Sequence, residues 1–251
     1  MNTIAIFGAP RSGTTWLGQL FNSSPNTLYR YQPLFSYEFK DYLSESNTKQ
    51  NIKQFHSNLV NASSEFVLTN IEFLKEETTH LVWKEVRYHH ITNNLLKNSD
   101  VKIVYIKRNP IEVLNSWYQA PKEFDNSWDI QTEWRYAPSK NLNKVEEFNG
   151  FEKWLDVNEI HHKNKEEFKD RVLIVDYAEL KSDTVNCVKD IFKFCDIPYT
   201  NQTNDFIIDS TTKHSTDSYS VYKSRKLDIK LPTNIIEEIK NSKRVNKYIK
   251  W

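Results

Sequence analysis

A short loop rich in glycine and hydroxyl side chains carries the strongest chemical signal in the sequence. It reads Gly8-Ala9-Pro10-Arg11-Ser12-Gly13-Thr14-Thr15-Trp16. The apolar run 3–7 before it predicts a buried strand, and helical spacing begins at Thr14. A loop between a strand and a helix aims backbone N–H groups and a helix N-terminus at one spot, which favours an anion. We therefore expect Arg11 and the amides of residues 12–15 to hold a phosphoryl group.

The loop has the frame of a P-loop but lacks its lysine. Gly8, Gly13 and Thr15 match G-x-x-x-x-G-K-[ST], and Thr14 occupies the lysine position. That lysine reaches the β- and γ-phosphates of ATP or GTP, so its absence argues against their hydrolysis. An arginine inside the loop suits a donor with one 5′-phosphoryl group that carries a transferable anion. A P-loop kinase of a small metabolite remains an alternative.

A second phosphate site is predicted about a hundred residues later. Arg108 follows the strongest strand pattern of the chain, 101–106, and Asn109-Pro110 then begins a helix. Ser116 lies eight residues after Arg108, inside that helix. A charged guanidinium at a strand end and a hydroxyl two turns along a helix can converge on one phosphate.

Both motifs resemble those of sulfotransferases that use 3′-phosphoadenosine 5′-phosphosulfate (PAPS). The family carries Pro-[Lys/Arg]-Ser-Gly-Thr-[Thr/Ser]-[Trp/Phe] after its first strand, and Arg-[Asp/Asn]-Pro with a serine eight residues after the arginine. The arginine form of the loop and residues 17–26 are similar to carbohydrate and bacterial members. The resemblance implies in-line transfer of a sulfuryl group to a hydroxyl or amine, most simply of a glycan or small glycoconjugate. PAP would be the product, and no metal would be needed.

Further residues acquire expected roles from this resemblance alone. Tyr177 lies in a segment similar to the family's Tyr-Glu-Asp-Leu and would approach the nucleotide, and Trp16 would stack on adenine. Lys223 and Arg225 lie in a stretch that resembles the late basic loop over the 3′-phosphate. Packing in the core is the competing interpretation for both aromatic residues.

The general base is where the chain departs from the family. Carbohydrate sulfotransferases offer Tyr-Glu-Pro after the first helix, whereas this chain has Tyr31-Gln32-Pro33, and an amide is no base near neutral pH. Glu38 is one replacement. The other is the pair Lys84-Glu85, at the end of the second predicted strand. A protein that binds the nucleotide without turnover is the remaining alternative.

Strands and helices alternate along the chain, which predicts a three-layer α/β/α fold with a mainly parallel sheet. We expect one sulfotransferase domain over residues 1–251, with ligands at the carboxyl ends of the strands. The predicted strands are 3–7, 81–86, 101–106 and 171–175; the predicted helices are 14–21, one through residues 91–96, one from 110, 151–168 and 184–194.

Two segments fit this plan less well. Residues 118–149 have no clear period and are expected to be an insertion over the active-site face. Trp117, Trp128 and Trp134 would there stack on sugar rings or pack in the core. Residues 221–251 hold nine basic against three acidic side chains. Most of that charge would lie on a solvated helix face, and the rest could close over an anionic ligand.

Composition narrows the remaining classes. The 251 residues carry 34 basic and 33 acidic side chains, so no overall basic field favours nucleic acid. No apolar run is long enough for a membrane span, and no secretory signal is visible, so the cytoplasm is the expected compartment. Cys187 and Cys195 are expected to be free thiols, which fits a reducing compartment. No oligomeric state is predicted.

Overall fold

A five-stranded parallel sheet forms the centre of the molecule. The structure is a computed structural model that describes residues 1–69, 71–215, 220–224 and 228–249, with the backbone alone at 223–224. The strands lie in the order β2-β3-β1-β4-β5, and each neighbouring pair is parallel. Their bounds are β1 (Asn2–Phe7), β2 (Thr27–Tyr31), β3 (His80–Glu85), β4 (Lys102–Lys107) and β5 (Val172–Asp176).

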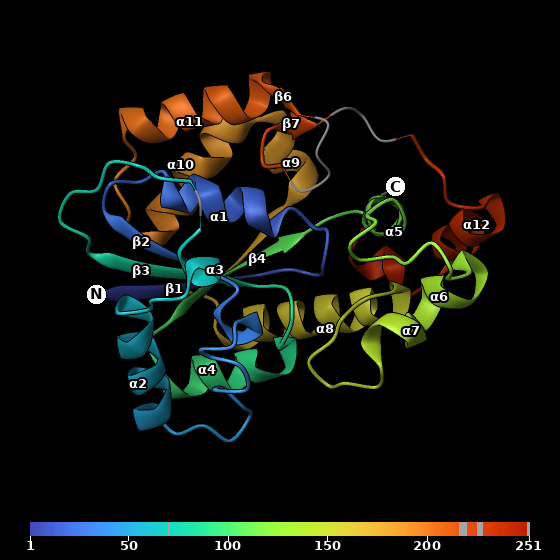
Figure 1. Cartoon of the computed structure of the whole chain (residues 1–251), viewed down its shortest axis with the longest axis horizontal. Helices are drawn as coiled ribbons and strands as arrows, with labels where there is room; N and C mark the ends of the chain where they lie inside the picture. The colour runs from blue at the N-terminus through green and yellow to red at the C-terminus, as the bar shows by residue number, and fades with distance from the viewer. Residues whose placement is uncertain (70, 216–219, 225–227, 250–251) are drawn as a thin grey trace.

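Helices cover both faces of the sheet and its carboxyl end (Figure 1). Above it in this view lie α1 (Thr14–Asn22), α9 (Tyr177–Ser182), α10 (Thr184–Cys195) and α11 (Asn201–Thr212). Below it lie α2 (Lys49–Val60), α4 (Thr92–Asn98) and α8 (Phe151–Glu167). Toward the carboxyl end lie α5 (Pro110–Tyr118), α6 (Ile130–Tyr136), α7 (Pro138–Asn141) and α12 (Thr233–Asn241). The short elements are α3 (Glu65–Leu68), η1 (Pro33–Phe35), η2 (His89–Ile91), η3 (Val245–Lys247), β6 (His214–Ser215) and β7 (Lys223–Ser224).

Alternation along the strands builds a separate core on each face of the sheet. In β1, Ala5 and Phe7 pack toward α2 and α4, whereas Ile4 and Ile6 pack toward α1, α10 and α11. Because β1 is apolar on both sides, it takes the central position. The three-layer α/β architecture expected from the sequence is confirmed.

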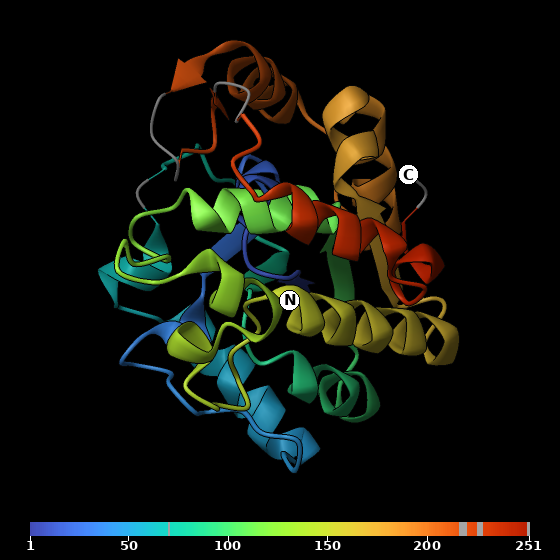
Figure 2. The same cartoon turned by 90° about the vertical axis from the view of Figure 1, so that its right-hand side faces the viewer.

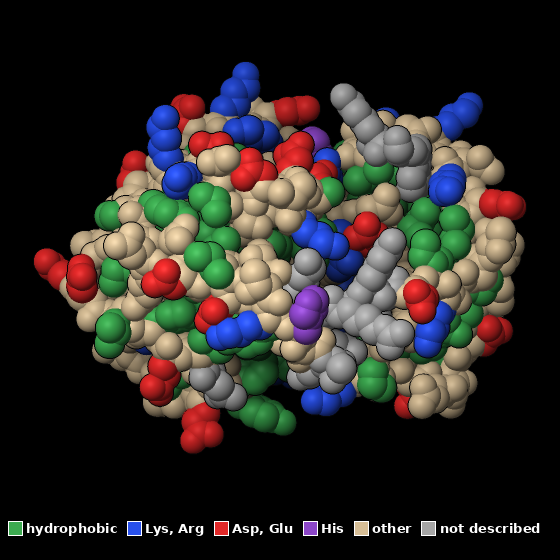
Figure 3. Space-filling view, turned by 90° about the horizontal axis from the view of Figure 1, so that it is seen from above, with side chains coloured by type: hydrophobic (Ala, Val, Ile, Leu, Met, Phe, Trp, Pro, Cys, Tyr) green, Lys and Arg blue, Asp and Glu red, His purple; other side chains and the backbone are tan. Residues whose placement is uncertain are grey.

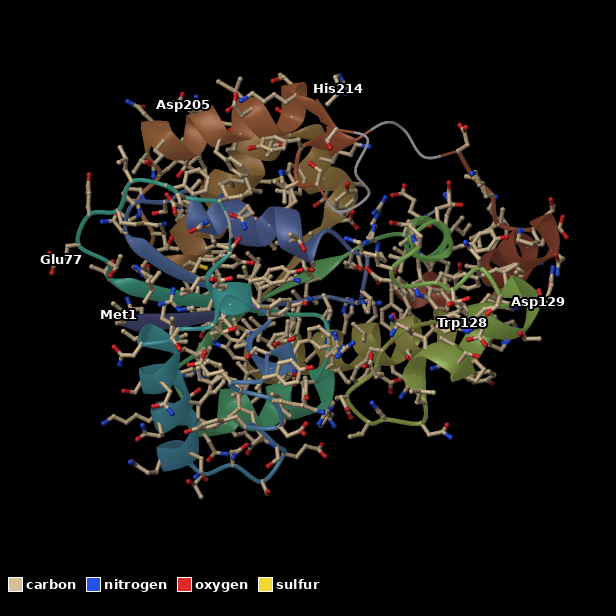
Figure 4. The ribbon with its side chains drawn as sticks, viewed as in Figure 1. Met1, Glu77, Trp128, Asp129, Asp205 and His214 are labelled. Atoms are coloured by element: carbon tan, nitrogen blue, oxygen red, sulfur yellow. The ribbon has the colours of Figure 1, made fainter. Side chains whose placement is uncertain are left out.

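A third core lies beyond the carboxyl ends of the strands, and apolar side chains of segment 118–149 form part of it. Figure 2 looks onto this end, where α5, α8 and α12 lie side by side. Trp117 and Trp134 are 2% and 5% exposed, and the Trp134 ring packs on Phe151 of α8 at 5.6 Å. Trp128, labelled in Figure 4 at the far side from Met1, packs edge-on against Phe124. Of the two alternatives for these tryptophans, packing in the core holds for Trp117 and Trp134, because they are buried there.

Candidate functional site

The loop after β1 has the conformation of an anion cradle. Arg11 has a φ of 68° and Gly13 a φ of 93°, so two residues of the turn adopt left-handed backbone. A Cβ on Gly13 would lie 2.7 Å from the Tyr177 ring, which leaves room for glycine alone. A non-glycine residue in this region is strained, and such strain concentrates at binding sites. The buried Ser12 hydroxyl has no hydrogen-bond partner in this structure.

The Arg11 side chain reaches the two segments that follow β4. Its Nε donates to the Ser116 hydroxyl at 3.1 Å, and its Nη1 donates to Glu123 Oε1 at 2.9 Å. Ser116 is 5% exposed, so this contact is shielded from water. The first predicted phosphate loop and the serine of the second predicted phosphate site therefore touch directly.

Arg108 completes the junction between the two predicted phosphate sites. Its Nη1 donates to the Arg11 carbonyl oxygen at 3.1 Å, and its guanidinium lies 4.4 Å from the centre of the Tyr177 ring. Its Nε pairs with Glu112 at 2.8 Å, one turn along α5. The Arg108 carbonyl accepts the Trp154 indole N–H of α8 at 3.0 Å, which fixes the strand end. The guanidinium is thus held by its neighbours but is still 18% exposed.

Sheet topology explains why these residues meet. β1 and β4 are parallel neighbours, with Phe7 opposite Tyr105, so the loops after them leave the same sheet edge. After β1, the chain continues to β2, which lies with β3 on one side of β1 in the sheet, whereas β4 and β5 lie on the other side of β1. Crevices at such switch points are the usual ligand sites of open α/β sheets. Figure 3 shows basic and acidic side chains together in a hollow near the middle of the upper face.

The two aromatic residues expected near the nucleotide lie on the α1 side of the loop. The Trp16 indole N–H donates to the Ser210 hydroxyl of α11 at 3.1 Å, and its ring meets Tyr177 edge-on at 6.2 Å. Both side chains are partly exposed. They therefore form a wall beside Arg108 that an adenine could contact.

The two threonines at the start of α1, Thr14 and Thr15, have different surroundings. Thr14 is 3% exposed and packs against Gly8, where a Cβ would lie 2.8 Å from its methyl group. Thr15 is partly exposed, and the interaction of its side chain with Tyr31 of β2 lowers the pKa of Tyr31, against the effect of burial. Thr15 thus connects the loop to the neighbouring strand end.

Lys84 is buried beside the loop. It is 1% exposed, and its ammonium lies 4.3 Å from the centre of the Tyr31 ring. Burial lowers the pKa of Lys84, and the positive charge of Arg11 lowers it further, whereas Glu85 and Glu123 act in the opposite direction. A lysine that loses its charge easily therefore lies within electrostatic reach of Arg11.

Both proposed carboxylate bases are engaged with backbone amides, and Glu85 is also buried. Glu38 is exposed, and its two oxygens accept from the backbone N–H groups of Ser63 and Ser64 at 3.4 and 3.0 Å, just before α3. Glu85 is fully buried, and its Oε1 accepts from the Leu34 N–H at 2.7 Å. Burial raises the pKa of Glu85 and so favours a neutral acid. Their geometry assigns Glu38 a capping role and Glu85 the positioning of the turn after β2.

The late basic stretch is described only in part. Lys223 lies in β7, paired with His214, with only its backbone described, and Arg225 lies outside the described residues. Their proposed contact with a 3′-phosphate therefore stays a prediction. Across the described residues, no group of three or more His, Cys, Asp or Glu side chains is placed to hold a metal ion. No helix of this described part is long and apolar enough to cross a bilayer.

Glu123 is the residue of the cluster that the sequence analysis did not single out. It lies in the turn after α5, and no motif or spacing marks it. The backbone brings it back to the loop, since its N–H donates to Ala120 at 2.8 Å and its carbonyl accepts the Trp117 indole N–H at 3.3 Å. Only the tertiary contact with Arg11 distinguishes it from other surface acids.

Comparisons with known proteins agree with this architecture. A family model described as "Sulfotransferase domain" matches residues 2–249. The fold is similar to mouse sulfotransferase SULT7A1 solved with PAP, at 17% identity and a TM-score of 0.59, over 98% of this chain and 85% of that one. It is also similar to the sulfotransferase domain of the Synechococcus PCC 7002 olefin synthase, at 15% identity and a TM-score of 0.50, over 100% and 89% of the two chains.

A third similar structure is a retinol dehydratase solved with retinol and PAP. It has 12% identity and a TM-score of 0.54, over 99% of this chain and 83% of that one. At identities this low, the structural similarity establishes a shared fold alone. A comparison with curated protein sequences gives no match.

Proposed function

Because this chain belongs to the sulfotransferase family, we propose that it transfers a sulfuryl group from PAPS to an acceptor hydroxyl or amine and releases PAP. The observation that carries the proposal is the junction of the two arginines. The 5′- and 3′-phosphates of PAP are attached to one ribose, so the two phosphate sites must be close together. The Arg108 guanidinium and the loop of Arg11 meet this requirement, because Arg108 Nη1 lies 3.1 Å from the Arg11 carbonyl oxygen. The solved relative that contains PAP supports the same ligand here.

The loop supplies the first half of the proposed mechanism. The amides of residues 12–15 and the Arg11 guanidinium stabilise the charge that grows on the leaving 5′-phosphate as the S–O bond breaks. Donors fixed in advance are effective in this role, and removal of one typically costs about 2.7–4 kcal/mol of barrier. The Ser12 hydroxyl, buried and without a partner, is a further donor for the same phosphate.

The second arginine and the aromatic wall position the donor. Arg108 and Ser116 hold the 3′-phosphate, and its binding energy aligns the distant sulfur. Trp16 and Tyr177 contact the adenine. The negative charge of PAPS favours the charged form of Lys84, which interacts electrostatically with Arg11. The Lys84 ammonium then stabilises the oxygens of the sulfuryl group during transfer.

For the acceptor we propose a carbohydrate or glycoconjugate hydroxyl, on the similarity of the first loop to carbohydrate sulfotransferases. The receiving surface is the aromatic group of Tyr31, Phe35 and Phe66. The Phe66 ring lies 5.3 Å from Tyr31 and 5.6 Å from Phe35, and Phe35 and Phe66 are 46% and 42% exposed. Apolar faces of this kind pack on the C–H face of a sugar as well as on an aromatic acceptor. We place this reaction in the cytoplasm.

Radiolabelled PAPS tests the proposal. The acceptors are N-acetylglucosamine for a sugar hydroxyl, 2-naphthol for a phenol and glucosamine for an amine. We expect labelled product from the sugars and also from 2-naphthol, since the aromatic surface accepts a sugar or a phenol. Arg11→Ala and Arg108→Ala should each lose about 100-fold or more. Full activity in both variants would contradict the proposed site, and PAP binding without transfer to any acceptor would indicate a non-catalytic binding protein.

A further inference from the structure

The proposed reaction needs a proton acceptor, and the residue at the position of the family's glutamate is Gln32. The acceptor O–H bond must break as its oxygen attacks sulfur, so a base must lie beside the sulfuryl group, within hydrogen-bond reach of that oxygen. Glu38 and Glu85 are both engaged with backbone amides, and Glu85 is completely buried. A carboxylate that contacts Arg11 would lie close to the reacting group.

Glu123 meets the geometric requirement. Its Oε1 lies 2.9 Å from Arg11 Nη1, so the carboxylate adjoins the guanidinium that faces the reacting group. It also interacts electrostatically with Lys84 and Tyr31, which lie at the ends of β3 and β2. The acidic side chain is thus next to the loop, the buried lysine and the aromatic surface proposed for the acceptor.

Access and rigidity favour a chemical role. The Glu123 side chain is 25% exposed, enough for an acceptor to approach, whereas the Arg11 side chain is 14% exposed. The Trp117 indole N–H donates to the Glu123 carbonyl at 3.3 Å, and the Glu123 backbone N–H donates to the Ala120 carbonyl at 2.8 Å. The backbone is anchored on both sides, so the carboxylate is presented from a fixed turn.

We propose that Glu123 is the general base of the sulfuryl transfer, an inference that rests on the proposed function. When PAPS binds, its negative charge pairs with Arg11 in place of the Glu123 carboxylate. The released carboxylate can then accept a hydrogen bond from the acceptor hydroxyl. The acceptor oxygen then forms a bond to sulfur, the S–O bond to the 5′-phosphate breaks, and its electron pair stays on PAP. The acceptor proton passes to Glu123.

Acceptors of different acidity separate this role from a structural one. Glu123→Gln retains a partner for Arg11 but cannot take a proton. With 2-naphthol and N-acetylglucosamine, which are un-ionised at mildly alkaline pH, we expect kcat to fall about 100-fold or more. With 4-nitrophenol, which is ionised there, we expect a fall of less than about 10-fold, because no proton has to be removed.

Two further variants complete the test. Glu123→Asp keeps a carboxylate and should retain more activity toward 2-naphthol than Glu123→Gln. Asp125→Asn changes an exposed acid two residues away, whose carboxylate accepts from Ser127, and should leave kcat unchanged. PAP affinity should be preserved or improved in Glu123→Gln, because a competing anion is removed from Arg11.

The outcomes distinguish this inference from the function on which it rests. Equal losses for ionised and un-ionised acceptors, or wild-type turnover of 2-naphthol and N-acetylglucosamine in Glu123→Gln, would overturn Glu123 as the base and leave sulfuryl transfer intact. A wild-type protein that binds no PAP and transfers to none of the three acceptors would overturn the proposed function itself.

Discussion

The Arg108 guanidinium donates a hydrogen bond to the carbonyl oxygen of Arg11 at 3.1 Å. The contact joins two loops that are 97 residues apart in the chain and leave adjacent strands at the same edge of the sheet. It also ties the backbone conformation of the first loop to the side chain of the second. The two loops therefore lie close enough together for one nucleotide to contact both.

Gly13→Ala should weaken PAP binding by about 5- to 150-fold. The added Cβ would lie 2.7 Å from the Tyr177 ring, and alanine is strained at a φ of 93°. Strain of this type costs about 1–3 kcal/mol, and the loop can relieve it by losing its anion-binding conformation. Titration calorimetry with PAP measures the loss. Gly13→Ala/Tyr177→Ala removes the clash but not the strained φ, so it should bind PAP more weakly than Tyr177→Ala alone. Equal affinity of these two variants for PAP would contradict the backbone argument.

Glu38→Gln and Glu85→Gln should both keep kcat near the wild-type value, without the loss of about 100-fold or more that removal of a general base causes. Each glutamine retains an oxygen that can accept from the backbone amide held by the glutamate. Steady-state kinetics with radiolabelled PAPS and N-acetylglucosamine provide the measurement. A fall of about 100-fold in either variant, with PAP affinity unchanged, would restore that residue as the base.

Phe66→Ala should weaken acceptor binding without affecting the donor. The ring is 42% exposed and packs on Tyr31 and Phe35 at the proposed acceptor surface. Loss of one aromatic contact corresponds to about a 2- to 10-fold rise in KM for the acceptor. Ile208→Ala, on α11 and 51% exposed, is the matched control and should change neither constant. A rise in KM for PAPS alone would place Phe66 at the donor instead.

His56 should make stability depend on pH. Its ring packs between Phe55 and Trp83, its Nε2 has no hydrogen-bond partner, and burial lowers the pKa of His56 to about 4. Because the pKa is lower in the folded state, the unfolded chain binds the proton more readily below pH 6.5. The free energy of unfolding should therefore fall by about 1.4 kcal/mol per pH unit between roughly pH 6.5 and 4 through this group.

His56→Leu isolates that contribution. Urea unfolding of the variant and the wild type at several pH values should give curves that diverge as the pH falls, with the variant relatively more stable in acid. Parallel curves across this range would show that His56 titrates alike in the folded and unfolded chain.

The strands and helices that position the phosphate sites could be predicted because their local signals agree with the fold. The run 3–7 became Asn2–Phe7, and Pro110 begins α5 as expected for a proline at a helix start. β2 was not predicted, since the mixed sequence Thr27–Tyr31 has no clear apolar alternation. Helix α2 was also not predicted, although its buried residues Ile52, Phe55 and Leu59 are spaced as on one face of a helix.

The site itself divides in the same way. Arg11, Arg108 and Ser116 were predicted as two phosphate sites, and the structure brings them together. The base could not be predicted, because reach depends on which face of β3 a residue occupies and on what lies above it. Glu85 looked available at a strand end, yet the turn after β2 covers it. Glu123 approaches Arg11 through a turn that only the completed fold defines.

Titration calorimetry with three nucleotides tests the central claim most directly: PAP, adenosine 5′-phosphate and adenosine 3′-phosphate against the wild type, Arg11→Ala and Arg108→Ala. Wild type should bind PAP more tightly than either monophosphate. Arg108→Ala should lose about 10-fold or more in affinity for PAP and for adenosine 3′-phosphate, but little for adenosine 5′-phosphate. Arg11→Ala should lose about 10-fold or more in affinity for PAP and for adenosine 5′-phosphate, but little for adenosine 3′-phosphate. The claim is that these two arginines hold one nucleotide at both of its phosphates. It would be contradicted if the wild type bound all three nucleotides with equal affinity, or bound ATP with magnesium as tightly as PAP.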